Sequence, residues 1–316
     1  MICQDINNYL INIFWKVIES LVLEIKSVSY QIKNYYELTK PKIWYLLVFT
    51  AFGAAVSASW LFNIPVSLTT WVLLLGGVAA GSAAADTLTG YNDRDIDAIM
   101  ERTKGRPIPS GRIPAKNALI FGLVLAGLSL ISAYFINIWA CFLMAFGLFD
   151  NVIVYSKWLK RSSQYNIILG GFSGAAPALI GYVAVTFQHI EIGFVMAGLV
   201  FFWIPTHIWS LALHIKDDYK KAKVPMLPVL FSETTSVRVI AITTLMMVIF
   251  SVLPFFFNQF GFIYLITAAI FGIVMMALSL LLLLKPSEKT SWIVFKFTSP
   301  YLAILFIAFM VDSFFH

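Results

Sequence analysis

Residues 68–97 read LTTWVLLLGGVAAGSAAADTLTGYNDRDID, and this stretch decides the fold. The part from 68 to 90 is an apolar run, and a helix needs about 20 such residues to cross roughly 30 Å of hydrocarbon. The run then ends abruptly in acidic residues. This pattern is typical of a membrane span that carries polar chemistry at one interface.

Similar apolar runs recur along the whole chain. Together they predict nine spans, at about 43–63, 68–90, 117–136, 138–156, 166–187, 192–215, 237–257, 260–284 and 292–315. Of the 316 residues, 60% are hydrophobic and 12% are charged, a balance that excludes a water-soluble single domain of this size. We therefore predict an all-α integral membrane protein with about nine transmembrane helices, in which the third and fourth turn tightly at Asn137.

Lysine and arginine alternate between the connections. All 22 lie before the first span or in and around every second connection, while the connections near 64–67, 137, 188–191 and 258–259 hold none. Positive charge marks the cytoplasmic side, so we expect the N-terminus inside and the C-terminus outside. The lysines and arginines that orient the protein in the membrane thus account for its net charge of +6. A nucleic-acid partner is not expected, because that reading needs a basic face on a soluble module.

The first 37 residues are expected to precede a polytopic membrane domain over 38–316. Residues 6–28 place apolar side chains on one helical stripe, which predicts a helix lying on the membrane surface. The alternative is packing against the cytoplasmic loops.

Neither a secretory signal nor a mitochondrial presequence is indicated, so we expect a prokaryotic plasma membrane. Cys3 and Cys141 lie far apart, which indicates neither a disulfide framework nor a zinc site.

The first acidic cluster follows the span at 68–90. If the helix continues, Asp86, Thr89, Asp93 and Asp97 fall near one face. The helix dipole disfavours acids at a helix C-terminus by roughly several tenths of a kcal/mol each, so a cation is expected there. Mg²⁺ suits the place, because it binds one or two carboxylates and takes water and phosphate oxygens as further ligands. The alternative is a solvated loop with acids that pair with nearby arginines and lysines.

A second acidic pair, Asp217 and Asp218, follows the span at 192–215 and is predicted to emerge on the same membrane face. The two clusters would then meet at one cavity. Cations from several loops would suit a diphosphate leaving group there. They are Arg106, Arg112, Lys157, Lys160, Arg161, Lys216, Lys220, Lys221 and Lys223. The alternative, for any single one, is that it only orients the protein.

Ionisable residues inside the spans should face the bundle interior or a wet cavity. For Asp86 a role in the functional site is favoured, while for Asp150 a structural hydrogen bond is equally plausible.

Pro205 should kink its span and free backbone carbonyls, so His207 is expected beside a cavity. There it would bind a polar group, a metal or a porphyrin, with helix packing as the alternative. The glycines around Gly181 indicate close helix packing.

Residues 93–103 (DRDIDAIMERT) and 106–113 (RPIPSGRI) resemble the first aspartate motif of the UbiA superfamily of intramembrane prenyltransferases. The segments 203–209 (WIPTHIW), 216–219 (KDDY) and 224–229 (VPMLPV) are similar to its heme-prenylating branch. The resemblance covers about 38–231. It implies a nine-helix UbiA-like bundle with a cavity open to the cytoplasm and to lipid, where Mg²⁺ on both motifs binds a prenyl diphosphate.

The same resemblance implies a reaction in which heme b, farnesyl diphosphate and water give heme o and diphosphate. It assigns catalysis and metal binding to Asp93, Asp97, Asp217 and Asp218. Substrate contacts are implied for Asp86, Thr89, Asn92, Arg94, Lys104, Arg106, Arg112, Lys157, Lys160, Trp203, His207, Lys216, Tyr219 and Lys221. The implied partners are farnesyl diphosphate, heme b, membrane lipid, and a heme a synthase or terminal oxidase assembly.

The sequence departs from the family pattern in each motif. Thr89 stands where the superfamily has asparagine, with Asn92 directly before Asp93 instead, and no acid follows four residues after Asp217 or Asp218. Three alternatives stay open. They are a UbiA-type enzyme for an aromatic, quinone-precursor or lipid acceptor, a transporter using its intramembrane acids, and a non-catalytic heme-binding subunit. The transporter is disfavoured because the acids concentrate at one interface.

Overall fold

The computed structural model describes residues 28–257 and 259–315, together with residues 15, 22, 24 and 26. Within these residues the chain is all-helical, and nine helices are long and apolar enough to cross a membrane. The predicted all-α fold with nine spans is therefore confirmed. The amphipathic stripe predicted over 6–28 lies almost entirely outside the described residues.

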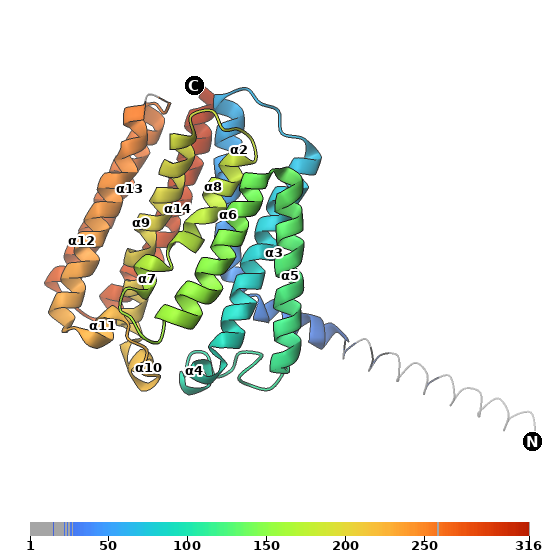
Figure 1. Ribbon diagram of the computed structural model, residues 1–316. Coiled ribbons are helices and arrows are strands. Elements are labelled where there is room, and N and C mark those ends of the chain that lie inside the picture. The colour runs from blue at the N-terminus through green and yellow to red at the C-terminus, as the bar shows by residue number, and fades with distance from the viewer. Residues whose placement is uncertain are drawn as a thin grey trace, which may run out of the picture.

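The spans form one bundle, with the short connecting helices at one end and the C-terminus at the other (Figure 1). The spans are α2 (Pro41–Leu61), α3 (Leu68–Asn92), α5 (Ala115–Ile136), α6 (Ile138–Phe149) with the π-helical segment η1 (Asp150–Leu159), α7 (Asn166–Leu169) with α8 (Phe172–Val183), α9 (Ile190–His214), α12 (Glu233–Val252) with the 3₁₀ segment η2 (Leu253–Phe257), α13 (Phe262–Leu284) and α14 (Glu288–Phe315). The connecting helices are α4 (Arg94–Ile99), α10 (Lys216–Lys221) and α11 (Leu227–Leu230).

Asn137 alone joins α5 to α6, as the sequence predicts. Its side-chain oxygen accepts a hydrogen bond from the Ala140 amide at 2.8 Å, which caps α6. Its Nδ2 donates to the Val183 carbonyl oxygen at 2.8 Å. Backbone groups at membrane depth need partners within the protein, so one asparagine both ends the turn and ties it to α8.

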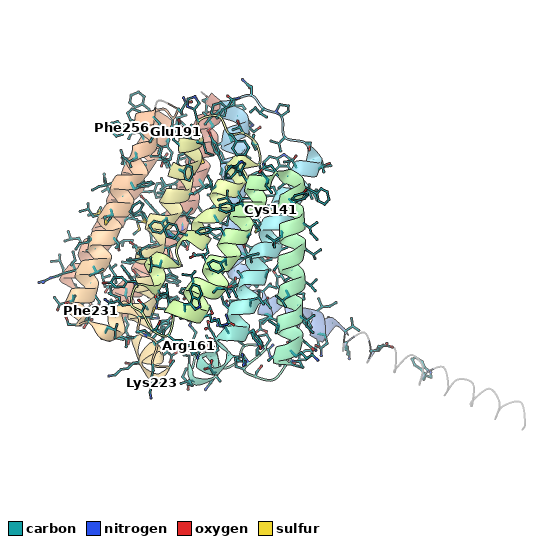
Figure 2. The ribbon with its side chains drawn as sticks, in the orientation of Figure 1. Cys141, Arg161, Glu191, Lys223, Phe231 and Phe256 are labelled. Atoms are coloured by element: carbon teal, nitrogen blue, oxygen red, sulfur yellow. The ribbon has the colours of Figure 1, made fainter. Side chains whose placement is uncertain are left out.

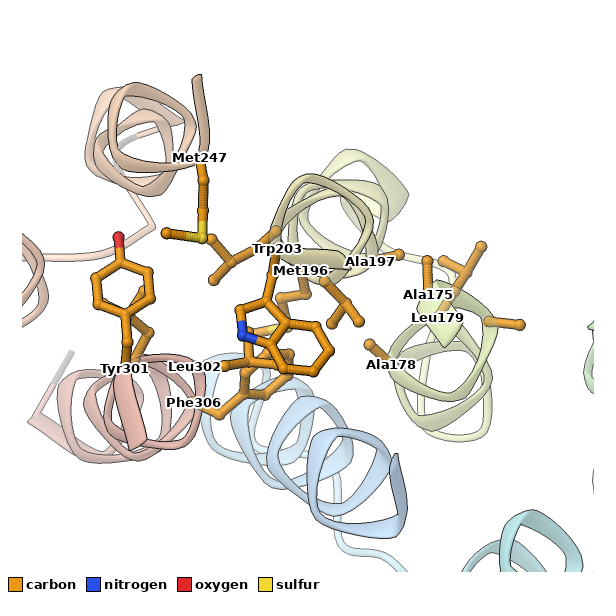
Figure 3. Packing of buried hydrophobic residues seen from close by; sticks show 14 of the residues in the cluster. Ala175, Ala178, Leu179, Met196, Ala197, Trp203, Met247, Tyr301, Leu302 and Phe306 are labelled. Carbon is orange, nitrogen blue, oxygen red and sulfur yellow. The ribbon is translucent and has the colours of Figure 1, made fainter. Parts of the chain in front are cut away.

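Close backbone approach holds α8 against α2. A Cβ atom built on Gly181 would lie 2.1 Å from the Ala51 carbonyl oxygen, so only glycine fits there. This confirms the packing interpretation of the glycine stripe. Between α9, α12 and α14, Figure 3 shows Trp203, Met247, Tyr301 and Phe306 filling the interior. The indole nitrogen of Trp203 donates a hydrogen bond to the Thr298 carbonyl oxygen at 2.7 Å, so this buried polar atom has a partner.

The outer surface of the bundle is apolar. On α5, Ile120, Leu123, Val124, Leu128 and Ile131 are each more than half exposed. Such a face suits lipid and not water. Polar residues gather at the ends instead, and Figure 2 shows Arg161 and Lys223 at one end with Glu191 at the other. The structure is that of a multi-pass membrane protein.

Asp150 begins η1 in the interior of the bundle. Its Oδ2 accepts a hydrogen bond from the Ser173 amide at 2.8 Å, and the neighbouring Asn151 donates to the Ser173 hydroxyl at 3.3 Å. The carboxylate therefore satisfies an amide in the first turn of α8, which would otherwise lack a partner. The structure supports the structural interpretation of Asp150.

Candidate active site

The first acidic cluster lies where α3 ends. Asp93 caps α3 with φ −93° and ψ 7°, in the sparsely populated region where active-site residues often lie. The chain then continues into α4, and the Asp97 amide donates to the Asp93 carbonyl oxygen at 2.8 Å. Both carboxylates are buried, with only 4% and 3% of each residue exposed.

Each of these buried carboxylates is paired with a cation from another segment. Lys160 Nζ lies 2.5 Å from Asp93 Oδ2, and Arg106 Nη1 lies 2.7 Å from Asp97 Oδ2. The Ser156 hydroxyl adds a longer contact to Asp93 Oδ1 at 3.4 Å. A buried charge without a partner is strongly destabilising, so each of these two buried carboxylates needs the cation that it contacts.

Two further acids extend this set. Asp86, nearly two turns before Asp93 in α3, accepts a hydrogen bond from Lys40 Nζ at 3.1 Å, and Lys40 also reaches the Thr89 hydroxyl at 3.4 Å. At the surface, Arg161 forms two hydrogen bonds to the Asp95 carboxylate, at 2.6 and 2.7 Å. The Arg161 hydrogen bonds lower the pKa of Asp95 to about 2. Four acids of one segment thus meet four cations.

The π-helical segment η1 leads to Lys160. Long π-helical runs are rare, and π-helical turns are frequent at functional sites. Asn92 ties α3 to η1 by donating to the Val152 carbonyl oxygen at 3.1 Å. Burial alone would lower the pKa of the Lys160 ammonium, but Tyr155, Asp93 and Tyr219 raise it above its ordinary value. Lys160 is therefore charged at neutral pH.

The second acidic cluster lies on α10, at the same end of the bundle as α4 (Figure 1). Asp217 is exposed and Asp218 is half-buried. Asp218 Oδ2 accepts a hydrogen bond from the Arg102 amide at 3.2 Å, which joins α10 to the loop after α4. Tyr219 is buried and is one of the groups that raise the pKa of Lys160. The two clusters therefore adjoin each other.

Several predicted substrate cations have other partners. The Arg112 guanidinium binds both Glu37 oxygens at 2.7 and 2.8 Å, and it also donates to Asn34 Oδ1 at 2.8 Å. Arg94 donates to the Tyr91 carbonyl oxygen, and Lys104 pairs with Glu101 at the surface. In the part of the chain that the structure describes, Lys157, Lys216 and Lys221 make no ion pair, so they are available to an anion.

The predicted residues of α9 lie against α14. The imidazole of His207 stacks on Trp203, with ring centroids 4.2 Å apart, and its Nδ1 lies 2.6 Å from the Thr298 hydroxyl. Phe295 covers its other side at 4.5 Å. α9 continues through Pro205 as one helix. Lys40, Ser156, Tyr155 and the α14 residues belong to no motif in the sequence, and α14 carries only a hydropathy signal.

The donor set fits Mg²⁺ together with a phosphate. Asp93 and Asp97 each give one oxygen to a cation and leave the other without an ion pair. Among the described residues, no group of three His, Cys, Asp or Glu side chains could hold a metal alone. Mg²⁺ commonly binds one or two carboxylates and takes the rest of its shell from water and phosphate oxygens. The pocket beside Lys40, Asp97 and Arg106 has a volume of only about 10 Å³, roughly the space of one water molecule.

Comparison with known proteins places this site in a family. Residues 46–309 match the model of the UbiA prenyltransferase family. The chain is 54% identical to protoheme IX farnesyltransferase 2 of Cenarchaeum symbiosum, covering 88% of this chain and 95% of the relative. It is 44% identical to protoheme IX farnesyltransferase of Desulforudis audaxviator, over 89% and 88% of the two chains.

Solved structures share the fold at lower identity. A digeranylgeranylglyceryl phosphate synthase matches with a TM-score of 0.74 at 24% identity, over 90% of this chain and 99% of that one. A UbiA homologue from Archaeoglobus fulgidus bound to DMAPP and Mg²⁺ matches with a TM-score of 0.59 at 20% identity, over 89% and 99%. At these identities the likeness concerns the bundle itself.

Proposed function

This chain belongs to the UbiA prenyltransferase family, and we propose that it joins the farnesyl group of farnesyl diphosphate to a vinyl group of heme b. Water is added and diphosphate leaves, which gives heme o. The choice of heme b as the acceptor rests on the 54% identity, over nearly the whole of both chains, to a protein named protoheme IX farnesyltransferase. The paired acids at the end of α3 support the diphosphate half of the reaction.

Departure of diphosphate from an allylic carbon leaves a carbocation beside a highly negative leaving group. Asp93 and Asp97 would hold a Mg²⁺ ion, which would stabilise the negative charge that develops on the leaving diphosphate. Lys160 and Arg106, no longer needed by those carboxylates, would donate to the diphosphate oxygens instead. Lys157, Lys216 and Lys221 add cations without ion pairs in the described part of the chain. The apolar walls of the bundle would keep water from the cation until the acceptor has reacted.

We place the end with α4 and α10 in the cytoplasm of a prokaryotic cell, with the chain in the plasma membrane. The positive charge at this end supports that orientation. A heme a synthase or a terminal oxidase assembly would then receive heme o.

The direct test is product analysis. Membranes or purified protein are supplied with heme b, farnesyl diphosphate and Mg²⁺, and the porphyrins are separated and identified by mass. Heme o is expected, and its formation should stop with EDTA and return with Mg²⁺. A preparation that binds heme b but prenylates an added aromatic acid, quinone precursor or glycerol lipid would point to another acceptor and refute the proposal.

A further inference from the structure

His207 presents one edge of its ring, because both faces are covered. Trp203 stacks on one face with an interplanar angle of 21°, and Phe295 covers the other at 32°. Among the described residues, Nδ1 has a hydrogen-bond partner in Thr298, and Nε2 has none. The two aromatic rings therefore hold the imidazole in a fixed orientation with one polar nitrogen uncommitted.

The Thr298 hydroxyl decides which nitrogen carries the proton. Its oxygen lies 2.6 Å from the Phe295 carbonyl oxygen and 2.6 Å from His207 Nδ1. A carbonyl oxygen has no proton to give, so the single hydroxyl proton must lie between the two oxygens. The hydroxyl then accepts from Nδ1–H. A neutral imidazole protonated at Nδ1 keeps the lone pair on Nε2.

We propose that Thr298 is a positioning residue that holds His207 as the Nδ1–H tautomer, so that Nε2 ligates the iron of heme b. The inference rests on the proposed function, since it names how the acceptor is held. Histidines that bind metals almost always donate their other ring N–H to a fixed partner, which orients the ring. A neutral histidine is also a common axial ligand of heme iron.

The aromatic rings around His207 would offer apolar contacts to a tetrapyrrole. Trp292 stacks on Phe295 with centroids 5.0 Å apart. Lys296 Nζ lies 5.1 Å from the Trp292 ring centroid. These rings extend along the seam of α9 and α14 toward the end that carries the acidic clusters, and the Lys296 ammonium has the charge that a porphyrin propionate needs.

Heme binding without any prenyl diphosphate tests this inference apart from the reaction. The purified full-length chain in detergent is titrated with ferrous heme b, and absorption spectra report both affinity and nitrogen ligation. Thr298→Val should weaken heme binding by about 10–100-fold, the usual effect of losing the partner of a metal-bound histidine. Thr298→Ser should restore it, because serine keeps the hydroxyl. His207→Ala should remove the signature of an imidazole-bound iron.

Two control variants make the outcome decisive. Thr267→Val on α13 removes a hydroxyl that also donates to a carbonyl one turn back, Ile263 at 2.8 Å, with no histidine involved; wild-type heme binding is expected. His214→Ala removes a histidine whose Nδ1 donates to the Glu288 carbonyl oxygen, and the ligated spectrum should persist.

If His207→Ala keeps the spectrum of imidazole-bound iron, or if only His214→Ala loses it, His207 does not ligate the iron. Wild-type affinity in Thr298→Val would overturn the positioning role. Formation of heme o by a protein with either result would leave the proposed function standing and reject only this inference.

Discussion

The two acidic clusters carry the same chemical groups in different surroundings. Asp93 and Asp97 are buried and ion-paired, whereas Asp217 is exposed and Asp218 receives a single backbone hydrogen bond from Arg102. Buried carboxylates need fixed partners, so the first cluster is organised before any ligand binds. The second is free to adjust. We infer that the first cluster sets where the diphosphate binds and the second completes the site around it.

The largest effect is expected at Asp93. Asp93→Asn removes a charged metal ligand, and metal stabilisation of a leaving group is worth several kcal/mol. Heme o formation should therefore fall by about 100-fold or more. The matched control is Asp95→Asn, two residues away, where the carboxylate pairs with Arg161 at the surface. Equal losses in the two variants, measured per folded protein, would contradict the assigned difference.

A smaller loss is expected in the second cluster. Asp217→Asn and Asp218→Asn should each lower activity by roughly tenfold, about 1.4 kcal/mol, mainly by weakening binding of diphosphate with Mg²⁺. Asp218 should be the more sensitive, because a neutral amide oxygen accepts the hydrogen bond from the Arg102 amide more weakly than a carboxylate does. The measurement is activity against Mg²⁺ concentration. If Asp217→Asn is as damaging as Asp93→Asn, the two clusters do not differ as proposed.

Replacing Lys160 tests whether ion pairs with cations of the protein organise the first cluster before a ligand binds. Lys160→Gln leaves Asp93 buried and unpaired, which should destabilise the metal-free protein by about 3 kcal/mol. Mg²⁺ no longer competes with an ammonium, so in the absence of diphosphate Mg²⁺ should raise the melting temperature of the variant at lower concentrations than it raises that of wild type. Thermal unfolding in detergent with increasing Mg²⁺ measures this. A variant that needs more Mg²⁺ than wild type would show that Lys160 does not compete for Asp93.

The smallest effect concerns the surface pair of the same segment. Arg161 holds the folded pKa of Asp95 at about 2, below the unfolded value of about 3.9. The pair's stabilisation is thus fully present above pH 4 and is lost as the pH falls toward 2. Because the pair is exposed, it contributes less than about 1 kcal/mol. The difference in melting temperature between wild type and Asp95→Asn should vanish near pH 2, and a constant difference would exclude this origin.

Local patterns made part of the molecule predictable. Hydropathy alone gave the nine spans, and a single polar residue between two apolar runs gave the turn at Asn137. The distant partners of the acids were not predictable, because Lys160 and Lys40 lie 67 and 46 residues from Asp93 and Asp86. Only the packed bundle brings them together.

The same limit applies to the residues with unexpected partners. Arg112 reads in sequence as a diphosphate cation, yet in the structure it binds Glu37 and Asn34. The π-helical form of η1 has no signal in the sequence. Thr298 lies in a span that is distinguished only by its hydropathy, so its contact with His207 emerges only when α9 packs on α14.

The central claim is that the buried first cluster holds a divalent cation together with diphosphate. Mn²⁺ binding to the purified protein, followed by EPR with and without inorganic diphosphate, tests it most directly. Wild type should retain Mn²⁺ strongly only when diphosphate is present, and Asp93→Asn should lose that retention. Equal retention by Asp93→Asn and wild type in the presence of diphosphate would contradict the claim.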